Sequence, residues 1–219
     1  MRLSGEQLAK KMLLYAVTDR MWLKPGQTLA QQVAAAIRGG ATLIQLREKD
    51  APYDEFLQIA KEVKQVTAQA GVPLIINDNL EIMQACDADG LHIGQSDGSV
   101  TTARRAIGDG KILGVSAQTV ELALQAETDG ADYLGVGDIF GSTTKLDAGG
   151  ATIQTLADIC RAVSIPTVAI GGIKRENIRF LAGSGTDGAA VISAIFAQSD
   201  AEAAARELFD ECKKAFWQD

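Results

Sequence analysis

The chain has 219 residues, 47% of them hydrophobic and 22% charged, which is ordinary globular composition with enough length to bury a substantial core. A formal net charge of −7 argues against nonspecific nucleic-acid binding, and no apolar run is long enough to span a bilayer. One histidine and three widely spaced cysteines exclude a zinc site of the usual composition.

The N-terminal segment is predicted to form a short helical extension at about residues 4–11. The apolar run after Lys10 and Lys11 reaches Asp19 too soon for a signal peptide, so we expect a cytoplasmic protein. No linker or change of composition marks a boundary, and residues 1–219 are therefore expected to form one domain.

Short β-branched or aliphatic runs alternate with longer segments of helical period along the chain. Apolar runs of this kind suit parallel strands that are buried on both faces. Eight strands are predicted, at residues 13–17, 42–46, 73–77, 90–93, 111–115, 132–136, 167–170 and 188–192.

The segments between these runs carry helix signals. Thr28 and Gln31 have the spacing of a capping box, in which each side chain bonds the backbone of the other residue. Ser199 and Glu202 have the same spacing and predict the start of a final helix. Apolar residues recur at helical spacing over 56–70 and 153–163.

Eight βα units in a chain of this length predict an α/β fold with one closed (β/α)₈ barrel. A doubly wound open sheet is the alternative. Polar clusters follow nearly all of the predicted strands, and a barrel would gather them onto one face, whereas an open sheet would concentrate them at its switch point. The distribution of these clusters favours the barrel.

The cluster after the second strand combines two cations with an amide. Strand alternation places Gln45, Arg47 and Lys49 on one side, opposite Leu46 and Glu48. Two cations and an amide that face one point suit a diphosphate attached to a ring with hydrogen-bonding edges. The alternative is a solvated charged turn.

Carboxylates follow the third and fourth strands. Asp78 and Asp97 would lie at the mouths of adjacent strands, where two carboxylates can share Mg²⁺ with phosphate oxygens and water. The alternatives are a helix N-cap, for which Asn79 is the candidate, and a turn in which Asp97 precedes Gly98.

Two polar residues belong to the fourth and fifth strands. His92 is expected to be an oriented polar residue of the barrel wall, with a general base as the less favoured alternative. Ser116 is suited to donate to a phosphate oxygen. A serine nucleophile is not expected, because there is no G-x-S-x-G elbow.

Anion-binding loops are predicted after the later strands. Residues 142–145 are a run of short hydroxyl donors that ends in a lysine, and such a loop can wrap anionic oxygens, although a flexible polar loop is the alternative. Gly171 and Gly172 after the seventh strand, with small residues around the eighth, suit the phosphate site of (β/α)₈ barrels; a plain turn is again the alternative.

Taken together, these motifs resemble the thiamine-phosphate synthase family, and the match runs over most of the chain. The matching pieces are Gln45-Leu46-Arg47-Glu48-Lys49, Asn77-Asp78, His92-Ile93-Gly94-Gln95-Ser96-Asp97, Gly114-Val115-Ser116, Thr144-Lys145, Ile170-Gly171-Gly172-Ile173 and Ile192-Ser193. The resemblance implies a (β/α)₈ barrel that joins hydroxymethylpyrimidine diphosphate to a thiazole phosphate by a dissociative substitution, giving thiamine phosphate and pyrophosphate.

The resemblance also implies the role of each site residue. Asp78 and Asp97 would hold Mg²⁺, and Gln45 would hydrogen-bond the pyrimidine. The diphosphate would be bound by Arg47, Lys49, Asn77, Ser116 and Lys145, of which Arg47, Lys49, Ser116 and Lys145 are the catalytic candidates. The thiazole phosphate would be held by Ser142, Thr143, Thr144, Gly172, Ile192 and Ser193.

One loop departs from the family pattern, because Asp138, Gly141 and Ser142 replace two prolines and a threonine. Glycine loosens a loop that proline would stiffen, and the added carboxylate would weaken the affinity for the thiazole phosphate.

Two other functions remain as alternatives, a related thiazole tautomerase and a non-catalytic phosphate-binding barrel. The expected partners are small phosphorylated substrates, with no nucleic acid and no membrane. The sequence leaves open whether the protein is a homo-oligomer.

Overall fold

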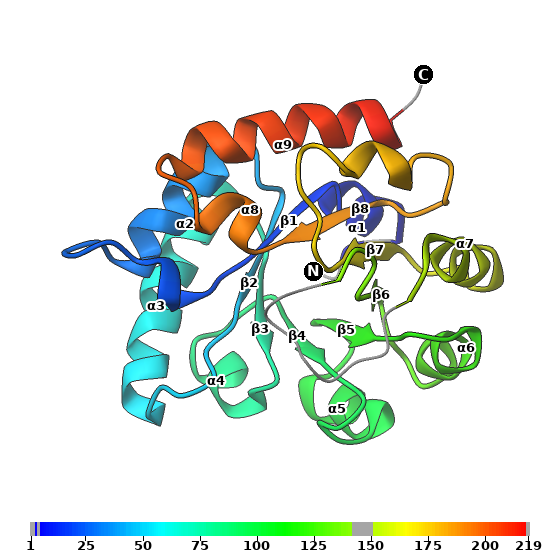
Figure 1. The fold of residues 1–219 in the computed structure, drawn as a ribbon. Coiled ribbons are helices and arrows are strands. Elements are labelled where there is room, and N and C mark those ends of the chain that lie inside the picture. The colour runs from blue at the N-terminus through cyan, green and yellow to red at the C-terminus, as the bar shows by residue number, and fades with distance from the viewer. Residues whose placement is uncertain (1–2, 4, 142–150, 218–219) are drawn as a thin grey trace.

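The computed structural model describes residue 3 and residues 5–141 and 151–217, and its centre is a closed barrel of eight parallel strands (Figure 1). Each strand pairs with the next in the sequence, and β8 pairs with β1. The strands are β1 Leu14–Val17, β2 Leu43–Leu46, β3 Leu74–Asn77, β4 Gly90–Ile93, β5 Ile112–Ser116, β6 Tyr133–Val136, β7 Thr167–Ile170 and β8 Gly188–Val191. The predicted barrel is therefore confirmed, the open sheet is wrong, and each predicted strand boundary holds to within one residue.

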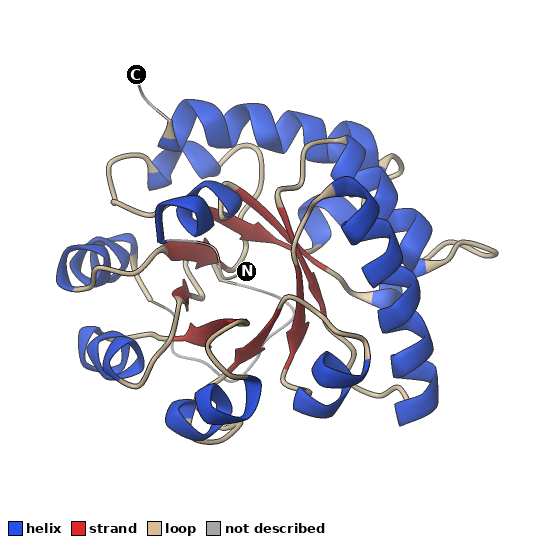
Figure 2. Ribbon diagram, turned by 180° about the vertical axis from the view of Figure 1, so that it is seen from behind, coloured by secondary structure: helices blue, strands red, loops and turns tan. Residues whose placement is uncertain are grey.

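Helices surround the strands, as the view from behind shows (Figure 2). The α-helices are α1 Gly5–Lys11, α2 Leu29–Arg38, α3 Tyr53–Ala70, α4 Leu80–Ala85, α5 Val100–Ile107, α6 Val120–Thr128, α7 Ile153–Ala162, α8 Ser193–Phe196 and α9 Ala201–Phe216. Two 3₁₀ turns, η1 Arg20–Trp22 and η2 Ile178–Leu181, lie in the connections. Within the described residues, no helix combines the length and the apolar character needed to cross a membrane.

The two predicted capping boxes have different outcomes. At α2, the Thr28 side chain accepts the Gln31 N–H and the Gln31 side chain accepts the Thr28 N–H, so this capping box is confirmed. At α9 the prediction is wrong by one residue. Asp200 is the N-cap, and its Oδ1 lies 3.0 Å from the backbone nitrogens of both Glu202 and Ala203. A single carboxylate oxygen thus accepts both bonds, and a charged acceptor is favoured at a helix N-terminus.

Asp200→Ala is expected to lower the free energy of unfolding by about 0.5–2 kcal/mol, the usual effect of losing an N-cap acceptor. Ser199→Ala, its neighbour in the same loop, should change stability by less than about 0.5 kcal/mol. Urea unfolding of the two variants beside the unsubstituted protein measures both effects. A larger loss in Ser199→Ala than in Asp200→Ala would contradict the observed cap.

The buried side chains form two layers, one between strands and helices and one inside the barrel. Leu8 of α1 and the nearby Met12 pack into the inner layer, so α1 closes one end of the barrel. The strand residues of the inner layer are Tyr15, Val17, Leu43, Ile75, Ile112, Tyr133, Val168 and Ala190. Strand alternation therefore decides which side chains face the barrel axis.

Glycines make room for the largest rings inside the barrel. Gly114 pairs with Tyr133 in the strand register, and a Cβ on Gly114 would lie 2.1 Å from Cζ of that tyrosine. A Cβ on Gly135 would lie 3.2 Å from Cε1 of His92. The two glycines thus let Tyr133 and His92 lie across the barrel.

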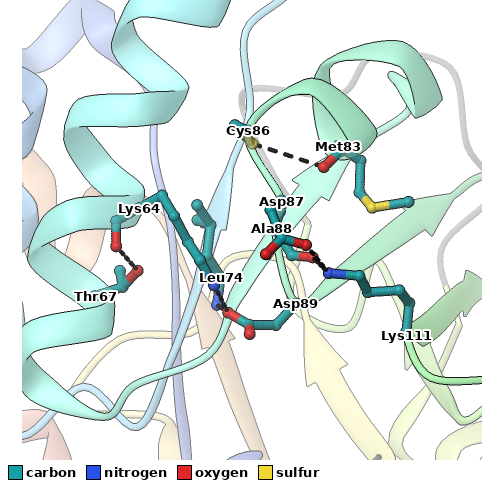
Figure 3. A network of polar contacts seen from close by, with 9 residues as sticks. All are labelled: Lys64, Thr67, Leu74, Met83, Cys86, Asp87, Ala88, Asp89 and Lys111. Carbon is teal, nitrogen blue, oxygen red and sulfur yellow. Dashed lines mark hydrogen bonds and ion pairs between the residues drawn. The ribbon is translucent and has the colours of Figure 1, made fainter. Parts of the chain in front are cut away.

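Three aspartates tie neighbouring strands together at the amino ends, opposite the polar clusters. Each precedes an even-numbered strand and accepts a backbone N–H from the start of the strand before it: Asp89 from Leu74 at 2.9 Å, Asp132 from Leu113 at 2.8 Å and Asp187 from Thr167 at 2.8 Å. Figure 3 shows the first of these, where Asp89 also pairs with Lys64 at 2.7 Å. These bonds stabilise the end of the barrel that carries no predicted site residue.

Candidate active site

The carboxyl ends of all eight strands meet at one rim, because every strand pair in the barrel is parallel. At the end of β2, Gln45 is 5% exposed, and its Nε2 donates to the hydroxyl of Tyr15 at 2.7 Å inside the barrel. The predicted inward orientation of Gln45 is confirmed. Beyond the strand, Arg47 is half-buried, its N–H donates to Thr18 Oγ1 at 3.1 Å, and Lys49 is exposed.

Glu48 lies on the opposite side of this segment, as strand alternation predicts. Its side chain is 1% exposed and its Oε2 lies 2.6 Å from Nε of Arg20, which pairs in turn with Glu55 at 2.8 Å. Burial raises the pKa of Glu48, and the Arg20 charge opposes that shift. The alternative of a solvated charged turn is therefore wrong for Glu48, which anchors the turn that presents Arg47.

Asp78 follows β3 in a left-handed backbone conformation, with a φ of 61°. Its N–H donates to the carbonyl of His92 in the neighbouring strand at 2.8 Å, and its Oδ2 accepts a bond from Asn77 Nδ2 at 2.5 Å. Asn79 is the N-cap of α4, with its Oδ1 2.9 Å from the nitrogen of Ile82. The capping alternative therefore applies to Asn79 and leaves Asp78 exposed at the rim.

Asp97 lies in the exposed loop after β4 and is a turn residue, as the alternative expects, but the turn closes back on Gly94, with the Asp97 N–H donating to the Gly94 carbonyl at 3.3 Å. Its Oδ2 accepts the Gly94 N–H at 2.7 Å, and its Oδ1 accepts a longer bond from Ser96 Oγ at 3.3 Å. Because β3 and β4 are adjacent, Asp78 and Asp97 follow neighbouring strand ends. Across the part of the chain that the structure describes, no three His, Cys, Asp or Glu side chains gather as a metal cage. This two-carboxylate donor set fits Mg²⁺ that takes its remaining ligands from phosphate oxygens and water.

A hydrogen-bonded series of five side chains crosses the barrel interior, and we call it the inner relay. From Gln45 it passes to Tyr15, whose hydroxyl lies 2.7 Å from that of Tyr133. His92 continues it, with Nδ1 2.9 Å from the Tyr133 hydroxyl and Nε2 3.0 Å from Ser116 Oγ. His92 is thus an oriented residue of the barrel wall, as expected. Sequence reasoning missed both tyrosines, although strand alternation would have placed them inside the barrel beside Gln45 and His92.

The loop after β6 packs against the loop after β7. The Ile139 and Phe140 N–H groups donate to the carbonyls of Ile170 and Gly171, each at 3.1 Å. Asp138 lies so close to Gly171 that a Cβ there would come 1.7 Å from the aspartate Oδ1. Gly141 has a φ of +74°, which proline cannot adopt, so this backbone excludes the family's proline at that position.

Gly171 and Gly172 form a turn with φ values of +107° and +60°, which explains why both are glycine. A Cβ on Gly172 would lie 2.5 Å from the carbonyl oxygen of Gly141, so the turn lies directly against the strand-6 loop. After β8, Ile192 is half-buried, and the four-residue helix α8 begins at Ser193. The predicted residues Ser142, Thr143, Thr144 and Lys145 lie outside the described residues.

Comparison with known proteins points to one family. The sequence model described as "Thiamine monophosphate synthase" matches residues 14–195. A thiamine-phosphate synthase of Clostridium tetani is 51% identical over 195 residues, which cover 89% of this chain and 93% of that protein. One of Clostridium botulinum is 48% identical over 201 residues, which cover 92% and 94% of the two chains.

A solved structure supports the same relationship. The thiamine phosphate pyrophosphorylase from Pyrococcus furiosus superposes with a TM-score of 0.88 at 37% identity, covering 95% of this chain and 98% of that one.

Proposed function

The chain belongs to the thiamine monophosphate synthase family and makes thiamine phosphate, and we propose that it does so by a magnesium-assisted, dissociative substitution. The substrates of the proposed reaction are hydroxymethylpyrimidine diphosphate and the thiazole phosphate. The bond between the pyrimidine methylene carbon and the diphosphate oxygen breaks, and both electrons leave with the diphosphate. The thiazole nitrogen then forms the new C–N bond. The observation that carries the activity is the 51% identity over 89% of the chain with a thiamine-phosphate synthase.

The pyrimidine diphosphate is assigned to the rim around β2 to β5. Gln45 would bind the ring from inside the barrel, and Ser116 at the end of β5 would donate to a diphosphate oxygen. Arg47, Lys49, Asn77 and Lys145 complete the proposed diphosphate site. These side chains supply positioning and stabilise charge on the leaving group, so the reaction needs no protein nucleophile.

Asp78 and Asp97 are proposed to hold Mg²⁺. Bound Mg²⁺ would neutralise charge that develops on the leaving diphosphate. A chain of net charge −7 does not attract an anionic substrate through its overall field, so the site must be locally basic or hold a metal, and the proposed cations and Mg²⁺ meet this condition together.

The thiazole phosphate is assigned to the loops after β6, β7 and β8. The proposed residues are Ser142, Thr143, Thr144, Gly172, Ile192 and Ser193. The packing of Gly172 against Gly141 supports this assignment, because Gly141 directly precedes Ser142, Thr143 and Thr144 in the sequence. Asp138 lies against Gly171 in the same region, where its charge would oppose phosphate binding.

The thiazole tautomerase and the non-catalytic barrel are not favoured, because the relatives of about 50% identity are synthases. We place the protein in the cytoplasm with small phosphorylated molecules as its partners.

Metal removal tests the magnesium requirement. Purified protein with both substrates should form thiamine phosphate and pyrophosphate, and excess EDTA should reduce the rate by at least about tenfold, since Mg²⁺ contributes several kcal/mol of charge stabilisation. Added Mg²⁺ should restore the rate. Undiminished turnover in EDTA, after dialysis against the chelator, would remove the metal from the proposal.

A further inference from the structure

The inner relay joins the two parts of the proposed pyrimidine diphosphate site through the barrel core. Its inner members are almost fully buried, with exposed fractions of 1% for Tyr15, 0% for Tyr133 and 8% for His92. Burial raises the pKa of both tyrosines, so each keeps its hydroxyl proton at neutral pH. Gln45 and Ser116 are the two ends. A relay of this length, closed off from bulk water, has few ways to arrange its hydrogens.

Proton counting leaves two arrangements when the imidazole is neutral. Each tyrosine hydroxyl has one hydrogen and two lone pairs, so a fully hydrogen-bonded hydroxyl donates once along the relay. Tyr15 has Gln45 and Tyr133 as partners, and Tyr133 has Tyr15, His92 and, as a further donor, the Gln45 amide. The ring of His92 carries one N–H and one acceptor nitrogen. All four bonds therefore run from Gln45 toward Ser116, or all four run the opposite way. In the structure, Gln45 Nε2 donates to Tyr15, which selects the first direction.

We propose that the inner relay couples recognition of an anion at Ser116 to recognition of an amino group at Gln45, with Tyr15, Tyr133 and His92 as positioning residues. This inference rests on the proposed function of the site. An anion accepts hydrogen bonds only, so Ser116 must donate its hydroxyl hydrogen to the diphosphate and accept from Nε2–H of His92. Nδ1 of His92 then accepts from the Tyr133 hydroxyl, Tyr133 accepts from the Tyr15 hydroxyl, and Tyr15 accepts from Nε2 of Gln45.

The consequence at Gln45 is a fixed amide orientation. The two hydrogens on Nε2 are then taken up by the hydroxyls of Tyr15 and Tyr133, and the side chain presents Oε1, an acceptor, to the ligand. This acceptor can bind the exocyclic amino group of the aminopyrimidine, whereas it would repel a keto oxygen at the same ring position. In the reverse direction, Gln45 would present an N–H group to the ligand, and this group would donate to a keto oxygen. The diphosphate end of the substrate thus enforces selectivity at its ring end.

The packing of the barrel supports a dedicated role for the relay. A Cβ on Gly114 would strike the Tyr133 ring at 2.1 Å, and one on Gly135 would press on His92 at 3.2 Å. Tyr15 meets Tyr133 edge to face, with an interplanar angle of 70° and 6.0 Å between ring centroids. The rings therefore have little freedom to turn away from their partners.

The tautomer of His92 reports the direction of the relay, and it can be read in the unsubstituted protein. His92 is the one histidine of the chain, so ¹⁵N-histidine labelling gives a single imidazole. With Mg²⁺ and the pyrimidine diphosphate bound, and no thiazole phosphate present, we expect the Nε2–H tautomer in the ¹⁵N spectrum. The Nδ1–H tautomer, or a ring protonated on both nitrogens, overturns the relay.

Substitution of a relay tyrosine tests the coupling. The probes are the pyrimidine diphosphate and its analogue with a keto group in place of the amino group, each titrated calorimetrically. In Tyr133→Phe the relay is cut, so the preference for the amino compound should fall by about tenfold, the value of one hydrogen bond. Tyr53→Phe is the matched control, because Tyr53 is the remaining tyrosine and is 47% exposed on α3.

The outcomes separate the relay from the function on which it rests. Failure of the unsubstituted protein to bind the pyrimidine diphosphate would overturn the proposed site together with the relay. Tight binding with the same amino-to-keto preference in Tyr133→Phe and in the unsubstituted protein would overturn the relay alone. An equal fall in Tyr53→Phe would also overturn it, while a fall confined to Tyr133→Phe supports it. If Tyr133→Phe does not fold, the tautomer measured in the unsubstituted protein decides.

Discussion

Asp97→Asn is expected to lower kcat for thiamine phosphate formation by about 10²–10³-fold, the usual effect of removing one charge-stabilising group from a preorganised site. A neutral amide is a poor ligand for Mg²⁺, so the metal would bind more weakly and the leaving diphosphate would keep more of its charge. Asp78→Asn should behave alike. In both variants, the Mg²⁺ concentration that gives half-maximal activity should rise.

Both substitutions are compatible with the local backbone, so the loss can be assigned to chemistry. Asn tolerates the left-handed conformation that Asp78 adopts at a φ of 61°. An amide oxygen can also accept the Gly94 N–H in place of Asp97 Oδ2. Thermal unfolding within a few degrees of the unsubstituted protein would confirm that the fold is retained.

Asp87→Asn is the matched control for the metal prediction. Asp87 also has a positive φ, of 51°, but it precedes β4 and pairs with Lys111 at the amino end of the barrel (Figure 3). Steady-state kinetics over a range of Mg²⁺ should show normal activity in this control. Full activity of Asp78→Asn and Asp97→Asn in the presence of EDTA would rule out both residues as metal ligands.

Arg47→Ala should raise the activation barrier by about 2.7–4 kcal/mol, which lowers kcat/KM for the pyrimidine diphosphate by about 10²–10³-fold. The guanidinium group is proposed to bind the leaving diphosphate. Its positive charge stabilises the negative charge that develops on the diphosphate as the bond to the methylene carbon breaks. The Glu48–Arg20 ion pair, with its 2.6 Å separation, holds the adjacent residue on the other side of the segment. Arg47 is therefore presented by an anchored turn.

Arg47→Lys separates the effect of charge from that of geometry. Lysine keeps the positive charge but lacks the planar fork that binds two phosphate oxygens, so it should recover only part of the lost rate. Arg105→Ala, at an exposed position of α5, is the control and should leave kcat/KM unchanged. If Arg47→Ala reduces the rate by less than about tenfold, Arg47 is only a solvated surface side chain and does not bind the diphosphate.

Local signals in the sequence determined the barrel and much of the rim. Apolar runs buried on both faces set the eight strands, and the period of two along β2 placed Gln45 inside and Glu48 opposite to it. The alternatives that the sequence offered for Asn79 as a cap and Asp97 as a turn residue were also local, because the hydrogen bonds involved join residues three apart. Hydrogen bonds between residues so close in the sequence depend on local conformation, so a sequence pattern can predict them.

The tertiary structure alone decided the features that depend on exact position or on distant residues. Whether Ser199 or Asp200 caps α9 differs by one residue in an otherwise similar pattern, and the path of the chain into the helix settles it in favour of Asp200. The inner relay joins residues up to 118 positions apart, since Tyr15 meets Tyr133 only when the barrel closes. Sequence periodicity gives the direction of each side chain, but closure of the barrel determines which side chains come within hydrogen-bonding distance across it.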